Sequence, residues 1–239
     1  MPPTTSSPFA AATSALVRAI TQLPEPEMRR PMIRSLLLTI AVIVVLWLII
    51  ATVLSSSLAD NAYLRWAIRV AGVLATPVLT WLLFPSITTG ILGFYAESIM
   101  AAVEHRHYPE QSPPPETRWG DQIRSLLTLM GLGILLNIAV LPLYLFFPGA
   151  NWVLFILMNG YLFGRSFFDL VMLRRLDWKT TRRMWPQYRG AFFLMGALLA
   201  GLFSIPLANL LAPVIGTAAG VHLAESYRPR HRLDRNIGN

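Results

Sequence analysis

Four long stretches of the chain contain no charged residue, and their lengths constrain the fold more than any other feature. They cover residues 35–59, 70–96, 125–164 and 190–224, which are 25, 27, 40 and 35 positions long. A membrane-spanning helix needs about 20 apolar residues, so each of the first two runs predicts one crossing. The third and fourth runs are too long for one crossing, and two full spans with a turn need on the order of 44 residues.

Two prolines decide how we interpret the fourth run. Pro206 and Pro213 leave 16 residues before them and 11 after them within residues 190–224, and a helix of even 16 residues reaches only about 24 Å. We therefore predict a re-entrant helical hairpin that enters the bilayer and turns back. The third run, residues 125–164, fits either two full spans or a second hairpin.

The composition is that of an integral membrane protein. Hydrophobic residues make up 54% of the chain and charged residues 13%, against about 25% charged in soluble domains. We predict a single membrane domain over residues 1–239, with 1–31 as a cytoplasmic segment and 226–239 as a basic cytoplasmic tail. Cysteine is absent and no nucleotide-binding, metalloprotease or hydrolase motif occurs, so we predict no enzyme activity, no metal and no cofactor.

The basic residues predict how the chain is oriented. All but two of the 20 lie before the first run, between the second and third runs, after the third run or in the tail; the exceptions, Arg65 and Arg69, follow the first run. The positive-inside rule therefore places both termini in the cytoplasm. A net charge of +8 then indicates orientation and contact with the lipid bilayer, and no nucleic-acid partner is predicted.

The segment between the third and fourth runs mixes apolar and basic residues. Residues 168–189 also carry Trp178, Trp185 and Tyr188, which are typical of membrane interfaces. We predict an amphipathic helix along the inner headgroup surface. The same pattern fits a solvated, charge-rich helix between two hairpins.

Polar residues within or next to the runs are candidate site residues. Arg165 precedes Asp169 by four positions, so the two are expected to form an ion pair on one helix face. Asn209 lies between Pro206 and Pro213, where freed backbone amides can bind an ion. The alternative for Asn209 is a hydrogen bond between helices.

Small residues four positions apart predict close packing of helices, because they let two backbones approach. The pairs are Gly160 and Gly164, Ala197 and Gly201, and Gly216 and Gly220.

The histidines do not form a metal-site motif. His105 and His107 stand two residues apart with no third ligand nearby. His222, three residues before Glu225, is predicted to be interfacial.

Three stretches of the chain resemble a known family. Residues 26–38 (PEMRRPMIRSLLL), 160–172 (GYLFGRSFFDLVM) and 204–223 (SIPLANLLAPVIGTAAGVHL) look like the CysZ sulfate permease family and its relatives, the etoposide-induced endoplasmic-reticulum membrane proteins. The resemblance implies an all-α integral membrane protein with two long transmembrane helices, two partly inserted helical hairpins and a homo-oligomeric state.

The same resemblance implies an activity and a site. The activity is permeation of sulfate or a similar oxyanion through the bacterial inner membrane, in support of sulfur assimilation. In the family, a Gly-Leu-Arg pattern before the first crossing is associated with sulfate binding; here Arg29 matches it, whereas Glu27 departs from it and adds a charge that repels a dianion. Arg30 adds a second guanidinium suited to oxyanions. The predicted binding residues are Arg29, Arg30, Arg165 and Asn209.

Two other interpretations fit the same residues. Arg29, Arg30 and Arg34 are also suited to anchoring the chain at lipid headgroups. The whole protein would then be a non-transporting scaffold or a membrane-homeostasis factor.

Overall fold

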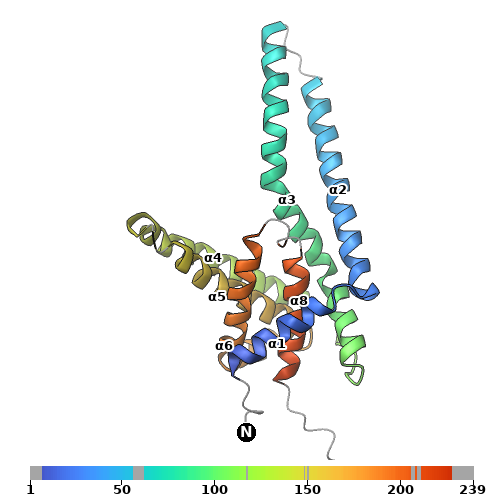
Figure 1. The fold of residues 1–239 in the computed structure, drawn as a ribbon, viewed down its shortest axis with the longest axis vertical. Coiled ribbons are helices and arrows are strands. Elements are labelled where there is room, and N and C mark those ends of the chain that lie inside the picture. Colours follow the sequence, from blue (N-terminus) through green and yellow to red (C-terminus); the bar gives the residue numbers. More distant parts are fainter. Residues whose placement is uncertain are drawn as a thin grey trace, which may run out of the picture. The chain divides into compact units, whose positions relative to one another are not determined.

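The computed structural model in Figure 1 describes residues 7–55, 62–116, 118–147, 149, 151–205, 208 and 211–227. Helices make up 86% of it, and no strand occurs among these residues, which confirms the predicted all-α class. The chain forms two compact units. We call Glu25–Ser98 the long-helix unit, and Met1–Pro24 together with Ile99–Asn239 the bundle unit.

The long-helix unit contains α2 (Pro26–Ser55) and residues 62–98 of α3 (Ala62–His107). Helix α2 holds the described part of the first uncharged run, and α3 holds the whole of the second, so both runs are helical as predicted. With 30 residues, α2 is about 45 Å long. Its apolar side chains are largely exposed, as Leu37 and Leu48 illustrate.

The third run forms two separate helices, α4 (Trp119–Phe146) and α5 (Asn151–Met172). Within the described residues, these two are the helices long and apolar enough to cross a membrane, judged by length and composition. Helix α2 contributes a shorter apolar segment, Ile40–Thr52. At 28 and 22 residues, α4 and α5 measure about 42 and 33 Å, so each is as long as a hydrocarbon core of about 30 Å.

The fourth run is also divided between two helices. Helix α6 (Trp178–Phe203) ends before the proline-containing stretch, and α8 (Ala212–Ser226) begins within it. Most of α8 is buried, because α1, α5 and α6 all pack against it. Gly216 and Gly220 leave room on α8 for Phe167 and Val171 of α5, as their spacing predicted.

Helix α1 (Pro8–Thr21) is an element that the sequence interpretation missed within residues 1–31. The Ser7 side chain caps it by accepting a hydrogen bond from the amide of Ala10, and Pro8 occupies the first turn. Its buried face consists of small residues and one leucine and packs against α8 and α6. These residues are Ala11, Ala12, Ala15, Leu16 and Ala19.

Helices α5 and α6 touch through their backbones. A Cβ atom on Gly196 would collide with the carbonyl oxygen of Gly160, and one on Gly164 would collide with the backbone of Phe192. The predicted Gly160 and Gly164 pair therefore does permit a close approach. The pair formed by Ala197 and Gly201 does so only in part, because a Cβ on Gly201 would meet open space.

The prediction of one amphipathic helix over residues 168–189 is wrong. Helix α5 ends at Met172, the chain turns, and α6 begins at Trp178. The aromatic residues expected at the membrane surface include Trp178 and Tyr188, both of which are buried. These two aromatic side chains pack inside the protein. The mixture of apolar and basic residues over 168–189 therefore corresponds to the turn between α5 and α6 in the bundle unit.

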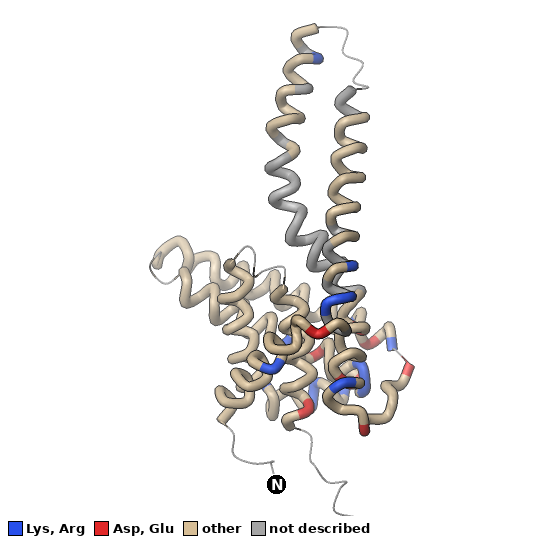
Figure 2. Tube along the Cα trace, turned by 45° about the vertical axis from the view of Figure 1, so that its right-hand side comes forward, with Lys and Arg blue, Asp and Glu red and all other residues tan. Residues whose placement is uncertain are grey.

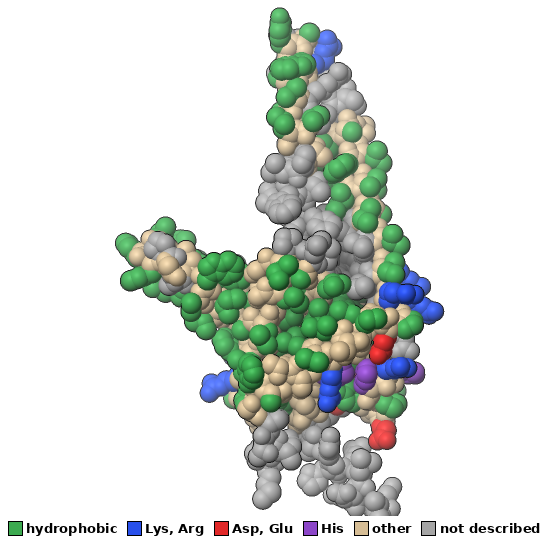
Figure 3. Space-filling model, viewed as in Figure 1, with side chains coloured by type: hydrophobic (Ala, Val, Ile, Leu, Met, Phe, Trp, Pro, Cys, Tyr) green, Lys and Arg blue, Asp and Glu red, His purple; other side chains and the backbone are tan. Residues whose placement is uncertain are grey.

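Charge and hydrophobicity are segregated within the bundle unit. The far ends of α4 and α5 are the end of α4 at Phe146 and the start of α5 at Asn151. Figure 2 shows that the Lys, Arg, Asp and Glu residues of the unit lie away from these far ends, which carry none. Hydrophobic side chains cover those far ends (Figure 3), including Phe146 at 77% and Trp152 at 69% exposure. Such exposure is unusual for a protein surrounded by water.

Candidate functional site

An ion pair within α5 is the first of three buried polar clusters in the bundle unit. Nη2 of Arg165 lies 2.9 Å from Oδ1 of Asp169, which confirms the pair expected from the sequence. Arg165 is 8% exposed and Asp169 only 2%. At this depth each charge needs the other, because an unpaired buried charge is costly.

Two neighbouring helices complete this cluster. From α4, the Ser125 hydroxyl donates to Oδ2 of Asp169 at 2.6 Å. From α6, the ring of Trp185 lies 4.8 Å from the Arg165 guanidinium, within the range of a cation–π contact. The ion pair therefore ties α4, α5 and α6 together.

The second cluster joins the end of α3 to the corner between α5 and α6. Oε2 of Glu104 lies 2.6 Å from Nη1 of Arg174 and 2.8 Å from Nη2 of Arg175. Arg175 also donates from Nη1 to the carbonyl oxygen of Ser112, at 2.8 Å. One carboxylate thus holds two guanidinium groups and fixes the loop after α3 against the corner.

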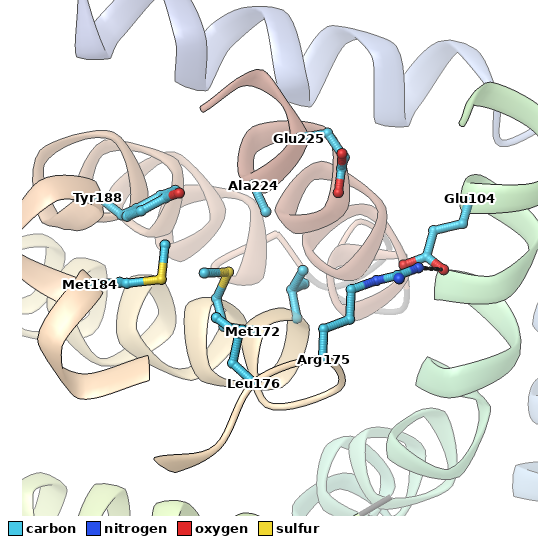
Figure 4. Close-up of a pocket in the computed structure, with 9 residues that line it drawn as sticks. Glu104, Met172, Arg175, Leu176, Met184, Tyr188, Ala224 and Glu225 are labelled. Carbon is cyan, nitrogen blue, oxygen red and sulfur yellow. Dashed lines mark hydrogen bonds and ion pairs between the residues drawn. The ribbon is translucent and has the colours of Figure 1, made fainter. Parts of the chain in front are cut away.

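A cavity of about 160 Å³ opens beside this cluster (Figure 4). Its apolar wall includes Met172, Leu176 and Met184, and Figure 4 shows Arg175 reaching from the cavity towards Glu104. Nε of Arg175 is buried and has no hydrogen-bond partner among the described residues. A donor in that state is satisfied by water or by a bound acceptor.

The third cluster surrounds His222, in the last turns of α8. The Tyr108 hydroxyl lies 2.8 Å from Nδ1 of His222, and Oε1 of Gln22 lies 3.3 Å from Nε2. The His107 ring meets the His222 ring edge-on, with centroids 5.2 Å apart. His222 therefore links the end of α1, the end of α3 and α8, a contact that no spacing in the sequence could have indicated.

Burial sets the protonation of this cluster. It lowers the pKa of His222 to about 4, with His107 and Arg18 adding to the effect, and it raises the pKa of Tyr108. At 15 residues, α8 is too short to cross a bilayer, and His222 lies at its polar end. Both groups are accordingly neutral at physiological pH.

The four predicted site residues have different surroundings. Arg165 is buried in its ion pair with Asp169. Arg29 and Arg30 lie in the first turns of α2, in the long-helix unit, and are exposed. Asn209 lies outside the described residues.

Long apolar helices with exposed side chains, such as α4 and α5, are typical of membrane proteins. A comparison with known protein families identifies which family of membrane proteins this is. Residues 15–213 match the family described as Sulfate transporter CysZ/Etoposide-induced protein 2.4. The chain belongs to this family, as its three motif stretches indicated. It is a family of transporter type. No curated protein and no solved structure matches the chain.

Proposed function

We propose that this protein is a membrane-embedded permease for sulfate or a similar oxyanion. The observation that carries the proposal is the family match over residues 15–213. The exposed apolar surfaces of α4 and α5 support placing these helices in a bilayer. In this account the protein is a homo-oligomer in a bacterial inner membrane, with both termini in the cytoplasm.

Arg29 and Arg30 are the proposed entry point for the anion. They lie in the first turns of α2, where the helix dipole favours negative charge. Two guanidinium groups suit the several oxygens of a tetrahedral oxyanion. Glu27, close by in the sequence, weakens the attraction for a dianion and favours an anion of lower charge.

Arg165 and Asn209 are proposed to contact the anion along its path. The Asp169 carboxylate engages Nη2 of Arg165, and a guanidinium carries five N–H donors, so donors are left for a second acceptor. Asn209 would add a side-chain amide between Pro206 and Pro213, two residues whose missing N–H groups disfavour continuous helical hydrogen bonding.

The membrane potential limits how such a permease can work. With the cytoplasm negative, moving a dianion inwards costs about 2 × 2.3 kcal/mol per 100 mV. Passive entry therefore requires rapid consumption of the anion inside the cell, or else coupling to a cation.

A flux assay tests the proposal. Protein reconstituted into liposomes, with the membrane potential clamped at zero, should admit labelled sulfate faster than empty liposomes. Arg29→Ala should slow the flux, whereas Arg65→Ala, a matched arginine predicted on the opposite side of the membrane, should leave it unchanged. Flux equal to that of empty liposomes would refute transport of sulfate.

A non-transporting scaffold is the second candidate. It is favoured by Glu27 in place of the family's glycine and by the engagement of Arg165 with Asp169. It predicts no flux of any oxyanion and stable partners that purify with the protein.

A further inference from the structure

The first half of α6 carries a basic surface that nothing in the helix balances. From Trp178 to Phe203 the helix contains no acidic residue. Its four basic residues are all exposed, and at 3.6 residues per turn they fall within an arc of about 120°. They are Lys179, Arg182, Arg183 and Arg189, which we call the basic arc.

The opposite side of α6 fixes the direction in which the basic arc faces. Thr181, Tyr188 and Phe192 are buried against the rest of the bundle unit. This packing holds the arc outwards.

The charges of the basic arc have little direct compensation, since Arg182 interacts at longer range with the Asp169 carboxylate, which is already paired with Arg165. Within the part of the chain that the structure describes, none of the four forms an ion pair, in contrast to Arg165, Arg174 and Arg175. Arg182 lies over the ring of Trp178 at 5.7 Å, which orients the guanidinium without neutralising it.

Two acidic residues lie at the start of the helix, where backbone amides engage them. Oδ2 of Asp121 accepts from the amide of Trp178 at 3.2 Å, and Oδ2 of Asp177 accepts from the amide of Lys179 at 3.1 Å. Both carboxylates are engaged by backbone amides at the start of α6, and the four positive charges of the arc outnumber these two negative ones.

We propose that the basic arc binds the headgroups of anionic phospholipids. After Arg189, α6 continues without charge as far as Phe203, so one helix is basic at one end and apolar at the other. The apolar end packs largely within the bundle unit, with Leu198 exposed, so the basic arc lies where a membrane-embedded bundle would meet the headgroups. Trp119 is 70% exposed at the start of α4, next to Asp121, and supplies an interfacial aromatic side chain.

The inference rests on the membrane location in the proposed function, but its test does not depend on transport. Full-length protein in neutral detergent is titrated with fluorescent phosphatidylglycerol. Unlabelled phosphatidylglycerol, phosphatidylcholine and inorganic phosphate serve as competitors. Each Lys or Arg near an anionic surface contributes about a fivefold gain in affinity.

Two variants with equal loss of charge separate a specific surface from net charge. The first replaces the four basic-arc residues with Gln. The control replaces four arginines of the tail with Gln, namely Arg228, Arg230, Arg232 and Arg235. We expect the first variant to bind phosphatidylglycerol at least about tenfold more weakly at low salt, and the control to change by less than about twofold. A third variant, with Lys and Arg exchanged at the four positions, should bind like the wild type.

Each alternative result has a definite meaning. The proposal would be overturned if both Gln variants lost the same affinity for phosphatidylglycerol, or if the basic-arc Gln variant kept full affinity. It would also be overturned if the variant with Lys and Arg exchanged did not bind, or if phosphatidylcholine or inorganic phosphate competed effectively. Lipid selectivity without sulfate flux would count against the permease alone. Sulfate flux without lipid selectivity would count against the basic arc alone.

Discussion

The buried pair of Arg165 and Asp169 allows a sharp test of how the bundle unit is held together. In Asp169→Ala the guanidinium of Arg165 stays buried without its carboxylate, which costs about 3–5 kcal/mol. Ser125→Ala removes only the 2.6 Å hydrogen bond to Asp169, and should cost about 1–3 kcal/mol. The double variant Arg165→Met, Asp169→Leu leaves no unpaired charge, so it should be more stable than Asp169→Ala.

The free energy of unfolding of the four proteins in detergent, measured by denaturant titration, checks this order. Glu110→Gln serves as the control, because Glu110 is exposed and its loss should change stability by less than about 0.5 kcal/mol. If the double variant is no more stable than Asp169→Ala, the pair is not the coupled unit described here. A loss below 1 kcal/mol in Asp169→Ala would likewise refute its burial.

Three further predictions concern packing and pH. Gly196→Ala should destabilise the protein by about 1–3 kcal/mol, because the new Cβ meets the Gly160 carbonyl. Gly201→Ala, the control, should be neutral or stabilising. Similar losses of stability in both variants would contradict the close approach of α5 and α6. The contribution of His222 to the free energy of unfolding should be fully present above pH 6.5 and be lost as the pH drops towards 4. In that range His222 binds a proton in the unfolded chain but not in the folded protein, where its pKa is about 4. His222→Asn should remove this component of the pH dependence of unfolding, and an unchanged curve would contradict it. Glu104→Gln should cost about 3–5 kcal/mol, since it withdraws the carboxylate shared by two arginines, and a wild-type unfolding midpoint would show that the contact contributes little.

Local patterns in the sequence predicted local structure well. The described parts of the uncharged runs are largely helical, Pro213 lies in the first turn of α8, and Arg165 pairs with Asp169 one turn away. The prediction at Gly160 and Gly164 succeeded for the same reason, because helical spacing alone places both on one face. The motif stretches gave the family correctly.

Contacts between distant segments could not be predicted in this way. The helix spacing that led to one helix over residues 168–189 did not reveal the turn before Trp178. Gln22 and His222 are 200 positions apart, and Glu104 meets Arg175 across 71 positions, so no periodic pattern relates them. Helix α1 left a readable signal, a Ser-Pro start followed by alanines at helical spacing, which the polar character of the first 31 residues obscured.

Sulfate uptake by living cells tests the central claim most directly. Bacteria that lack their own sulfate transporters should regain growth on sulfate as sole sulfur source, and accumulate labelled sulfate, when they express this chain. The Arg29→Ala variant should restore less uptake than Arg65→Ala at equal membrane expression. Well-expressed wild-type protein that restores neither growth nor uptake would contradict a sulfate permease.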